Sequence, residues 1–136
     1  YSEDQPADGP YATAICNWMQ YIRDNKDPFI TGDGTQRRDM LHVNDAVSAN
    51  IFAMNYDNNF NGSNFDVGTG DNISLNEIKE VIEVLHPNVN FEYRESRPNE
   101  VDVTRADISP LKNLGWQTEI SIKRGVFRCF KQLQKA

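Results

Sequence analysis

The side chains in this sequence best suited to chemistry are arginines that could meet a small anion. The 136 residues carry 14 Lys and Arg against 20 Asp and Glu, which gives a net charge of −6. This charge balance argues against nucleic acid as a partner, because the chain has no general field that would hold a polyanion. A small anion could still bind where a few arginines converge, since the guanidinium fork matches phosphate oxygens better than lysine does.

The cysteines and histidines do not form a reactive set. Cys16 and Cys129 belong to no Cys-x-x-Cys pair, and each lies in an apolar helical pattern. We therefore expect two buried free thiols in a reducing cytoplasm rather than a disulfide or a metal site. No neighbours of His42 complete a metal site or a catalytic triad, and His86 stands at the end of a helical pattern, so we expect structural roles for both.

Helices alternate with short strands in the elements that must position these side chains. Apolar periodicity predicts helices over residues 11–22, 44–54 (with Asn44 as the N-cap), 74–85, 109–114 and 121–133. Short runs of strand-forming residues predict strands at 28–31, 40–43, 64–67, 91–94 and 103–106. Ser74 and Glu77 have the spacing of a capping box, which gives the third helix the clearest start in the chain. The pattern predicts a mixed α/β fold.

Three motifs follow one another along the chain. Residues 32–39 read Gly-Asp-Gly-Thr-Gln-Arg-Arg-Asp and continue as His-Val-Asn-Asp at 42–45. Phe-Asp-Val-Gly-Thr-Gly at 65–70 precedes Ser-Leu-Asn-Glu at 74–77, and Arg-Pro-Asn-Glu at 97–100 precedes Ala-Asp at 106–107 and Leu-Gly-Trp at 114–116. In this order the motifs resemble the carboxyl-terminal part of the extended short-chain dehydrogenase/reductases, the family of NAD-dependent nucleotide-sugar epimerases and dehydratases.

The resemblance implies that residues 1–136 form the carboxyl-terminal, substrate-binding portion of a Rossmann-type enzyme. The chain has no glycine-rich dinucleotide loop after a strand and no Tyr-x-x-x-Lys pair. We therefore expect the amino-terminal dinucleotide-binding domain to lie upstream of Tyr1, and we assign no catalytic, cofactor-binding or metal residue to this chain. NAD is the implied cofactor of the complete enzyme, and the chain alone is expected to be inactive.

The resemblance also assigns substrate-binding positions. Arg38 and Arg97 stand where family members hold the diphosphate of a nucleotide sugar, although pairing with a local carboxylate such as Asp39 or Glu100 is the structural alternative for them. Glu100 stands near the ribose, with a salt bridge to Arg97 as its alternative role. Arg37 would point elsewhere from an extended segment and is expected to be solvated.

The remaining expected substrate contacts include two departures from the family pattern. Thr31 stands where an aromatic residue often lies beside the base, and Phe29 is the candidate to replace it. Asp66 stands where the family often has Asn, and Tyr11 follows the loop near the start of the first helix. Trp18 and Trp116 are expected in the core rather than against a base.

These features predict part of a 4-epimerase-like enzyme that binds a nucleotide-diphosphate sugar. Part of a sugar-nucleotide 4,6-dehydratase or UDP-glucuronate decarboxylase is the alternative within the enzymes, and a non-catalytic binding module is the alternative from another class. We expect a cytoplasmic protein that forms a homo-oligomer and has no membrane partner, and residues 1–6 lack the features of a signal peptide. The helix at 44–54 and the strand at 65–67 are expected to leave an apolar patch exposed without the upstream domain.

Overall fold

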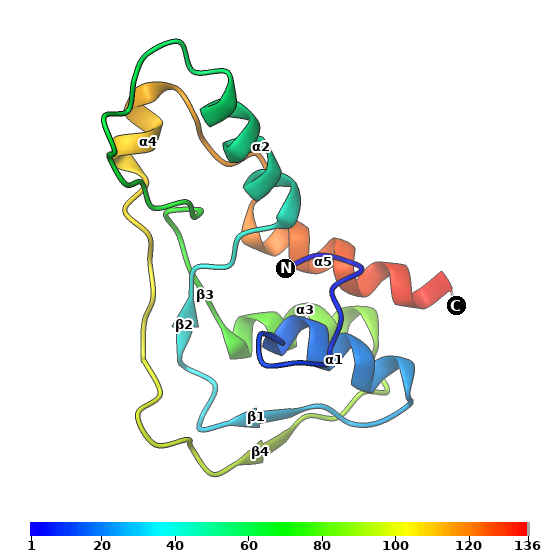
Figure 1. The fold of residues 1–136 in the computed structure, drawn as a ribbon. Helices are drawn as coiled ribbons and strands as arrows, with labels where there is room; N and C mark the ends of the chain where they lie inside the picture. Colours follow the sequence, from blue (N-terminus) through cyan, green and yellow to red (C-terminus); the bar gives the residue numbers. More distant parts are fainter. Residues whose placement is uncertain (136) are drawn as a thin grey trace.

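The computed structural model describes residues 1–135, with side chains through residue 134. Figure 1 shows two lobes, a larger one built on α1, α3 and α5 and a smaller one built on α2 and α4. The helices are α1 (Ala14–Arg23), α2 (Val43–Met54), α3 (Leu75–Leu85), α4 (Ser109–Leu114) and α5 (Ile122–Lys131), followed by the 3-10 turn η1 (Gln132–Lys135). The strands are β1 (Phe29–Thr31), β2 (Arg37–Arg38), β3 (Ile73–Ser74) and β4 (Glu92–Arg94). The expected mixed α/β fold is confirmed.

The larger lobe holds the main hydrophobic core. Apolar faces of α1, α3 and α5 converge there, and Ile30 of β1 and Ile73 of β3 join them. The thiols of Cys16 and Cys129 lie in this core, which confirms that both cysteines are buried and free. Trp18 is also buried, as expected, and its indole N–H donates to the carbonyl oxygen of Phe29 at 3.0 Å. This hydrogen bond fixes β1 against α1.

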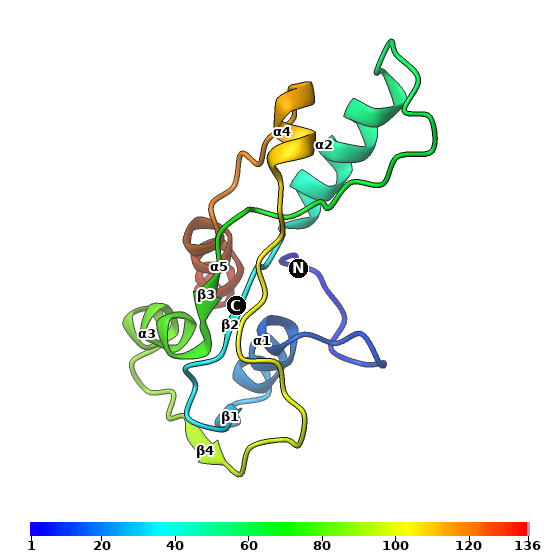
Figure 2. The same cartoon turned by 90° about the vertical axis from the view of Figure 1, so that its left-hand side faces the viewer.

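The smaller lobe has a core of its own. Ala49 of α2 packs against Leu111 and Trp116, so the second tryptophan is also in a core as expected. A chain of aromatic contacts continues this cluster outward from the helix through Phe52, Tyr56, Phe60 and Phe65. Figure 2 shows the long segment after β4 running up to α4 and joining the two lobes.

Two short sheets hold the segment between α1 and α2. Strands β1 and β4 are parallel, with Phe29 opposite Glu92 and Thr31 opposite Arg94. Strands β2 and β3 are antiparallel, with Arg37 opposite Ser74. The turn at residues 32–35 between β1 and β2 contains Gly34, whose φ of +79° and close approach to the Asn76 side chain both require glycine.

All five expected helices are present, and each begins within three residues of its expected start. The capping box of α3 is confirmed, because Ser74 Oγ accepts from the Glu77 N–H and the Glu77 carboxylate accepts from the Ser74 N–H. The N-cap of α2 is His42 rather than Asn44, because the His42 ring nitrogen Nδ1 accepts the Asn44 N–H at 3.2 Å. The first helix begins at Ala14 and not at Tyr11, since the Thr13 hydroxyl caps it.

Three of the expected strands are wrong or nearly absent. Residues 40–42 belong to no strand and lead directly into α2, although Tyr1 donates to the Leu41 carbonyl at 2.9 Å and accepts the Val43 N–H at 2.8 Å, while residues 64–67 have no ladder. Of residues 103–106, Val103 alone makes an isolated bridge, to Arg37. An extended segment counts as a strand only when another backbone pairs with it, and such pairing cannot be read from local alternation.

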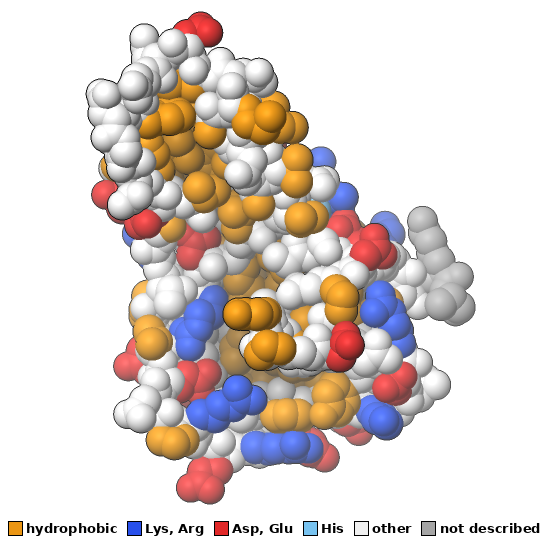
Figure 3. Space-filling model, in the orientation of Figure 1, with side chains coloured by type: hydrophobic (Ala, Val, Ile, Leu, Met, Phe, Trp, Pro, Cys, Tyr) orange, Lys and Arg blue, Asp and Glu red, His pale blue; other side chains and the backbone are white. Residues whose placement is uncertain are grey.

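One face of α2 is apolar and exposed. Val43, Val47, Ile51 and Met54 are 43%, 51%, 52% and 83% exposed, and their spacing places them along one side of the helix. Figure 3 shows apolar side chains gathered over the α2 and α4 lobe. This stripe is the exposed apolar patch expected on the helix. Within residues 1–135, no helix combines the length and the apolar character needed to cross a membrane.

Candidate functional site

A cavity of about 580 Å³ lies between α1, β1, the end of β2 with the residues that follow it, and the segment after β4. The aromatic, arginine and carboxylate side chains expected to bind substrate meet in it. Five of the seven expected substrate-binding residues line it, namely Phe29, Thr31, Arg38, Arg97 and Glu100. The amino-terminal segment and α1 add Tyr1, Thr13, Asn17, Trp18 and Tyr21 to the lining.

Strand β1 presents Phe29 and Thr31 to the cavity because alternate residues of a strand share a face, while Ile30 between them is buried in the core. The Phe29 ring meets the Tyr21 ring edge-on at 5.8 Å between centroids. The guanidinium of Arg94, on the neighbouring strand, lies over the same ring at 3.8 Å. Phe29 is therefore held by two neighbouring side chains, which restricts the motion of its ring in the cavity.

Arg38 reaches the cavity from β2. Its guanidinium donates to the carbonyl oxygen of Arg37 at 2.9 Å, and another of its nitrogens lies 3.6 Å from a carboxylate oxygen of Glu100. The two side chains are about one quarter exposed. A partly exposed pair at this distance contributes at most about 1 kcal/mol, so an incoming anion can compete with Glu100 for Arg38.

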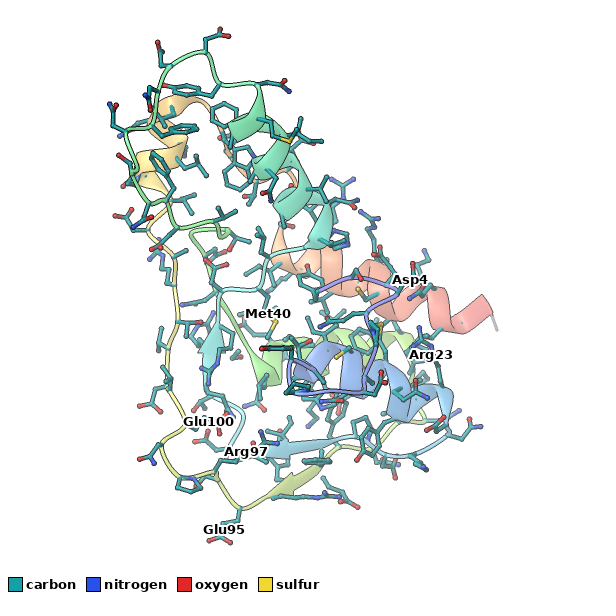
Figure 4. The ribbon with its side chains drawn as sticks, in the orientation of Figure 1. Asp4, Arg23, Met40, Glu95, Arg97 and Glu100 are labelled. Atoms are coloured by element: carbon teal, nitrogen blue, oxygen red, sulfur yellow. The ribbon has the colours of Figure 1, made fainter. Side chains whose placement is uncertain are left out.

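Arg97 and Glu100 come from the segment between β4 and α4. Figure 4 shows both near the turn that joins β1 to β2, whereas Glu95 points away from the body of the protein. Both also line a second hollow of about 400 Å³ beside the turn, together with Gln36. Glu100 pairs with Arg38 rather than with Arg97, which was the alternative considered for it. Arg97 is exposed, and its guanidinium has no ion-pair partner within the described residues.

The expectation that Arg37 is solvated is wrong. Its guanidinium lies 2.8 Å from the Glu77 carboxylate and donates to the side-chain oxygen of Asn72 at 2.7 Å. The β2–β3 pairing places Arg37 opposite Ser74, one turn from Glu77 on α3. Neighbouring arginines on a strand point to opposite sides, so Arg37 holds α3 while Arg38 faces the cavity.

Tyr11 and Asp66 lie outside the cavity. Tyr11 is 90% exposed on the loop before α1. Asp66 is exposed on the segment that follows the aromatic cluster of the smaller lobe, and no hydrogen bond of its side chain is formed within the described residues. Their assignment came from the motif resemblance alone, and it stays a prediction about the complete protein.

Two residues near the cavity were not anticipated. Gln36 is 8% exposed, and its amide donates to the carbonyl oxygen of Thr31 at 2.8 Å and to Glu100 at 3.4 Å. The carboxylate of Asp39 accepts backbone N–H bonds from Thr69, Gly70 and Ala106, together with the Thr69 hydroxyl. Local sequence patterns do not predict these contacts, because the bonded partners are 5 to 67 positions away along the chain.

The histidines have the structural roles expected of them. His42 is 1% exposed, and because its Nδ1 accepts the α2 cap bond, the proton sits on Nε2, which lies 2.9 Å from Glu3. His86 ends α3, with its Nε2 2.9 Å from the carbonyl oxygen of Phe130. Burial raises the pKa of the Cys129 thiol to about 12, so it is not a nucleophile. Among residues 1–135, no group of three or more potential ligands could hold a metal.

The sequence and the fold both match known proteins. The family model described as GDP-mannose 4,6 dehydratase matches residues 1–129. A Methanocaldococcus jannaschii protein provisionally named UDP-glucose 4-epimerase is 33% identical over 132 residues, which are 94% of this chain and 41% of that protein. The crystal structure of Thermotoga maritima UDP-glucose 4-epimerase with UDP-glucose has a TM-score of 0.83 at 25% identity, over 99% of this chain and 43% of that one.

A further solved structure shares the fold. It is the UDP-glucuronic acid 4-epimerase of Bacillus cereus in complex with UDP-glucuronic acid and NAD, with a TM-score of 0.84 at 23% identity over 99% of this chain and 42% of that one. The chain thus spans less than half the length of the proteins it matches. Because the family model covers nearly the whole chain, this protein belongs to the GDP-mannose 4,6 dehydratase family of NAD-dependent epimerases and dehydratases, within the extended short-chain dehydrogenase/reductases.

Proposed function

We propose that this chain is the substrate-binding portion of a nucleotide-sugar 4-epimerase-like enzyme. The observation that carries the proposal is the single cavity that brings Phe29 and Thr31 together with Arg38, Arg97 and Glu100. An aromatic surface, two guanidinium groups and a carboxylate match the base, the diphosphate and the ribose hydroxyls of a nucleotide sugar.

Each group has a separate task in this proposal. Arg38 and Arg97 neutralise the diphosphate, and Arg38 exchanges its long contact with Glu100 for phosphate oxygens. Glu100 accepts hydrogen bonds from ribose hydroxyls, and the Phe29 ring packs against the base. Binding the nucleotide at these points leaves the sugar as the part held for reaction, so the chain contributes orientation.

NAD does not fit the residues of this chain. Its pyrophosphate needs a glycine-rich turn at the start of a helix, and the sequence has no such loop and no Tyr-x-x-x-Lys pair. We propose that both belong to another part of the complete protein, which would be the direct partner of this chain. Hydride transfer is the chemistry that NAD supplies there.

Calorimetric titration of the complete protein with UDP-glucose tests the diphosphate role. Removing one charge-assisted contact of about 1.5–3 kcal/mol predicts that Arg38→Ala weakens binding by roughly 10- to 150-fold. Arg124→Ala is the matched control, because Arg124 is exposed on α5 and does not line the cavity. Unchanged affinity in a folded Arg38→Ala protein would rule out this role.

A 4,6-dehydratase is the second candidate, favoured by the description of the matching family model. The two enzymes give different products from the same substrate, since an epimerase conserves mass and a dehydratase removes one water. Mass spectrometry and NMR of the products from UDP-, GDP- and dTDP-sugars separate them. Tight binding without any product from the panel would favour the non-catalytic module.

A further inference from the structure

Gln36 is a buried polar residue placed between two parts of the cavity wall. Its side-chain amide donates to the carbonyl oxygen of Thr31 at 2.8 Å and to a carboxylate oxygen of Glu100 at 3.4 Å. An amide nitrogen carries two hydrogens, so these two acceptors account for both. Gln36 therefore joins the end of β1, on the base side, to the carboxylate on the ribose side.

The backbone around Gln36 is itself fixed. Its carbonyl oxygen accepts the Leu75 N–H at 3.3 Å, at the start of α3, and the next residue donates its N–H to the carbonyl of Asp102 at 2.7 Å. A buried side chain has little conformational freedom when its own carbonyl and the next residue's N–H are both hydrogen-bonded. Gln36 can thus act as a fixed reference point for more loosely held neighbours.

Glu100 belongs to a loosely held segment. This segment runs from Arg94 to Asp102 and is fixed at both ends, because the Arg94 carbonyl accepts the Gly32 N–H and the Asp102 carbonyl accepts the Arg37 N–H. Between these ends, the contacts of Glu100 with Gln36 and with Arg38 are the side-chain ties to the body of the protein among the described residues. The position of Glu100 thus depends on two donors.

Arg38 and Gln36 would respond differently to a bound diphosphate. Arg38 is the charged donor that a diphosphate would recruit, so its 3.6 Å contact with Glu100 is the one that is given up. Gln36 is neutral and has its other hydrogen engaged by Thr31, so a phosphate does not draw it away. Gln36 would then be the donor that keeps Glu100 in place in the complex.

We propose that Gln36 is a positioning residue that holds the Glu100 carboxylate against the ribose hydroxyls while Arg38 serves the diphosphate. This inference rests on the proposed function, because it assumes a nucleoside diphosphate in the cavity. It goes further by giving Gln36 a role that depends on the ribose hydroxyls and is independent of the phosphates.

The test compares two ligands in the complete protein by calorimetry. UDP carries the ribose diol, and 2′,3′-dideoxyuridine diphosphate lacks it. Gln36→Met keeps the length of the side chain and removes the donor, so it should weaken UDP binding by roughly 5- to 10-fold and leave the dideoxy ligand within about 2-fold, as expected for one hydrogen bond. Equal weakening for both ligands, or none for UDP, overturns the role.

Two further variants separate positioning from general damage. In a Glu100→Gln background, Gln36→Met should change UDP affinity by less than about 2-fold, because the carboxylate that Gln36 positions is already gone. Gln36→Glu should bind UDP poorly at neutral pH and recover as the pH falls, because the new carboxyl then gains a proton to donate. Additive losses in the double variant, or no pH-dependent recovery, contradict the proposal.

The proposed function and this inference fail in different ways. If the unaltered protein binds neither UDP nor UDP-glucose, the nucleotide site itself is wrong, and the role of Gln36 falls with it. If the unaltered protein binds UDP and Arg38→Ala weakens that binding, but Gln36→Met acts equally on both ligands, only the positioning role is overturned.

Discussion

Asp39 offers a direct test of how the motif segments hold one another. Its carboxylate accepts the Thr69 N–H at 2.9 Å and the Thr69 hydroxyl at 2.6 Å on one oxygen. The other oxygen accepts the N–H groups of Gly70 and Ala106, both at 3.1 Å. One side chain therefore joins the end of β2 to the glycine turn at 68–70 and to the segment before α4.

The perturbation is Asp39→Asn, which preserves shape and removes one acceptor. In either orientation, the new NH₂ group faces at least one backbone N–H that was bonded, and the remaining bonds lose the negative charge. A bond to a charged acceptor contributes about 1.5–3 kcal/mol, and leaving a donor unpaired costs a similar amount. Because Asp39 is only half-buried, we expect a loss of about 2–3 kcal/mol in the free energy of unfolding.

Urea unfolding of the chain at pH 7, followed by circular dichroism, measures this loss. Asp57→Asn is the control, because Asp57 is exposed in the loop after α2, where surface substitutions change stability by less than about 0.5 kcal/mol. If Asp39→Asn is as stable as Asp57→Asn, the carboxylate does not hold the three segments together, and the reasoning is wrong.

Three further outcomes follow from the same structure. Gly68→Ala should destabilise the fold by more than 1 kcal/mol in urea unfolding, because a Cβ there would lie 2.4 Å from the Ala106 side chain and 2.8 Å from the Asp39 carboxylate. The hydrogen bond from the Ser74 N–H, together with the nearby charge of Arg37, lowers the pKa of Glu77 from its ordinary value of 4.5. The stability that this carboxylate contributes is therefore fully present above pH 4.5 and is lost as the pH falls through the lowered pKa. Glu77→Gln should therefore cost roughly 1 kcal/mol at pH 7 and nothing at the acid end of a urea titration series. The chain should self-associate in light scattering through the exposed stripe of α2, and Val47→Lys should reduce this association; a monomer at high concentration contradicts it.

Local sequence rules predict the helices well because the residues that set the ends of a helix are close together in the sequence. The capping box of Ser74 and Glu77 needs only four consecutive positions, and the glycine after α4 is a left-handed cap as its type suggests. The cap of α2 was missed because a histidine nitrogen replaced the usual oxygen acceptor. Strands of two or three residues depend on partners far along the chain, which is why residues 40–43 and 64–67 were predicted wrongly.

The cavity could be predicted in part because the resemblance supplied positions that no local pattern supplies. Phe29, Thr31, Arg38, Arg97 and Glu100 come from three separate segments, yet they line one cavity. The partners of these residues could not be predicted. A sequence does not show that Glu100 turns to Arg38 rather than to its near neighbour Arg97, since that choice depends on how the segment after β4 folds back.

The two arginines of the cavity also differ in how firmly they are held. Arg38 stands on a paired strand, with its guanidinium bonded to the preceding carbonyl, so most of its ordering is complete before a ligand arrives. Arg97 is exposed on the segment after β4 and must be ordered when it binds, which offsets part of its contact energy. A diphosphate would therefore be placed mainly by Arg38, with Arg97 closing from the outer side. On the same outer segment, the bond from the Gln36 amide already holds the Glu100 carboxylate before a ligand arrives, whereas Arg97 would be ordered by the phosphate itself.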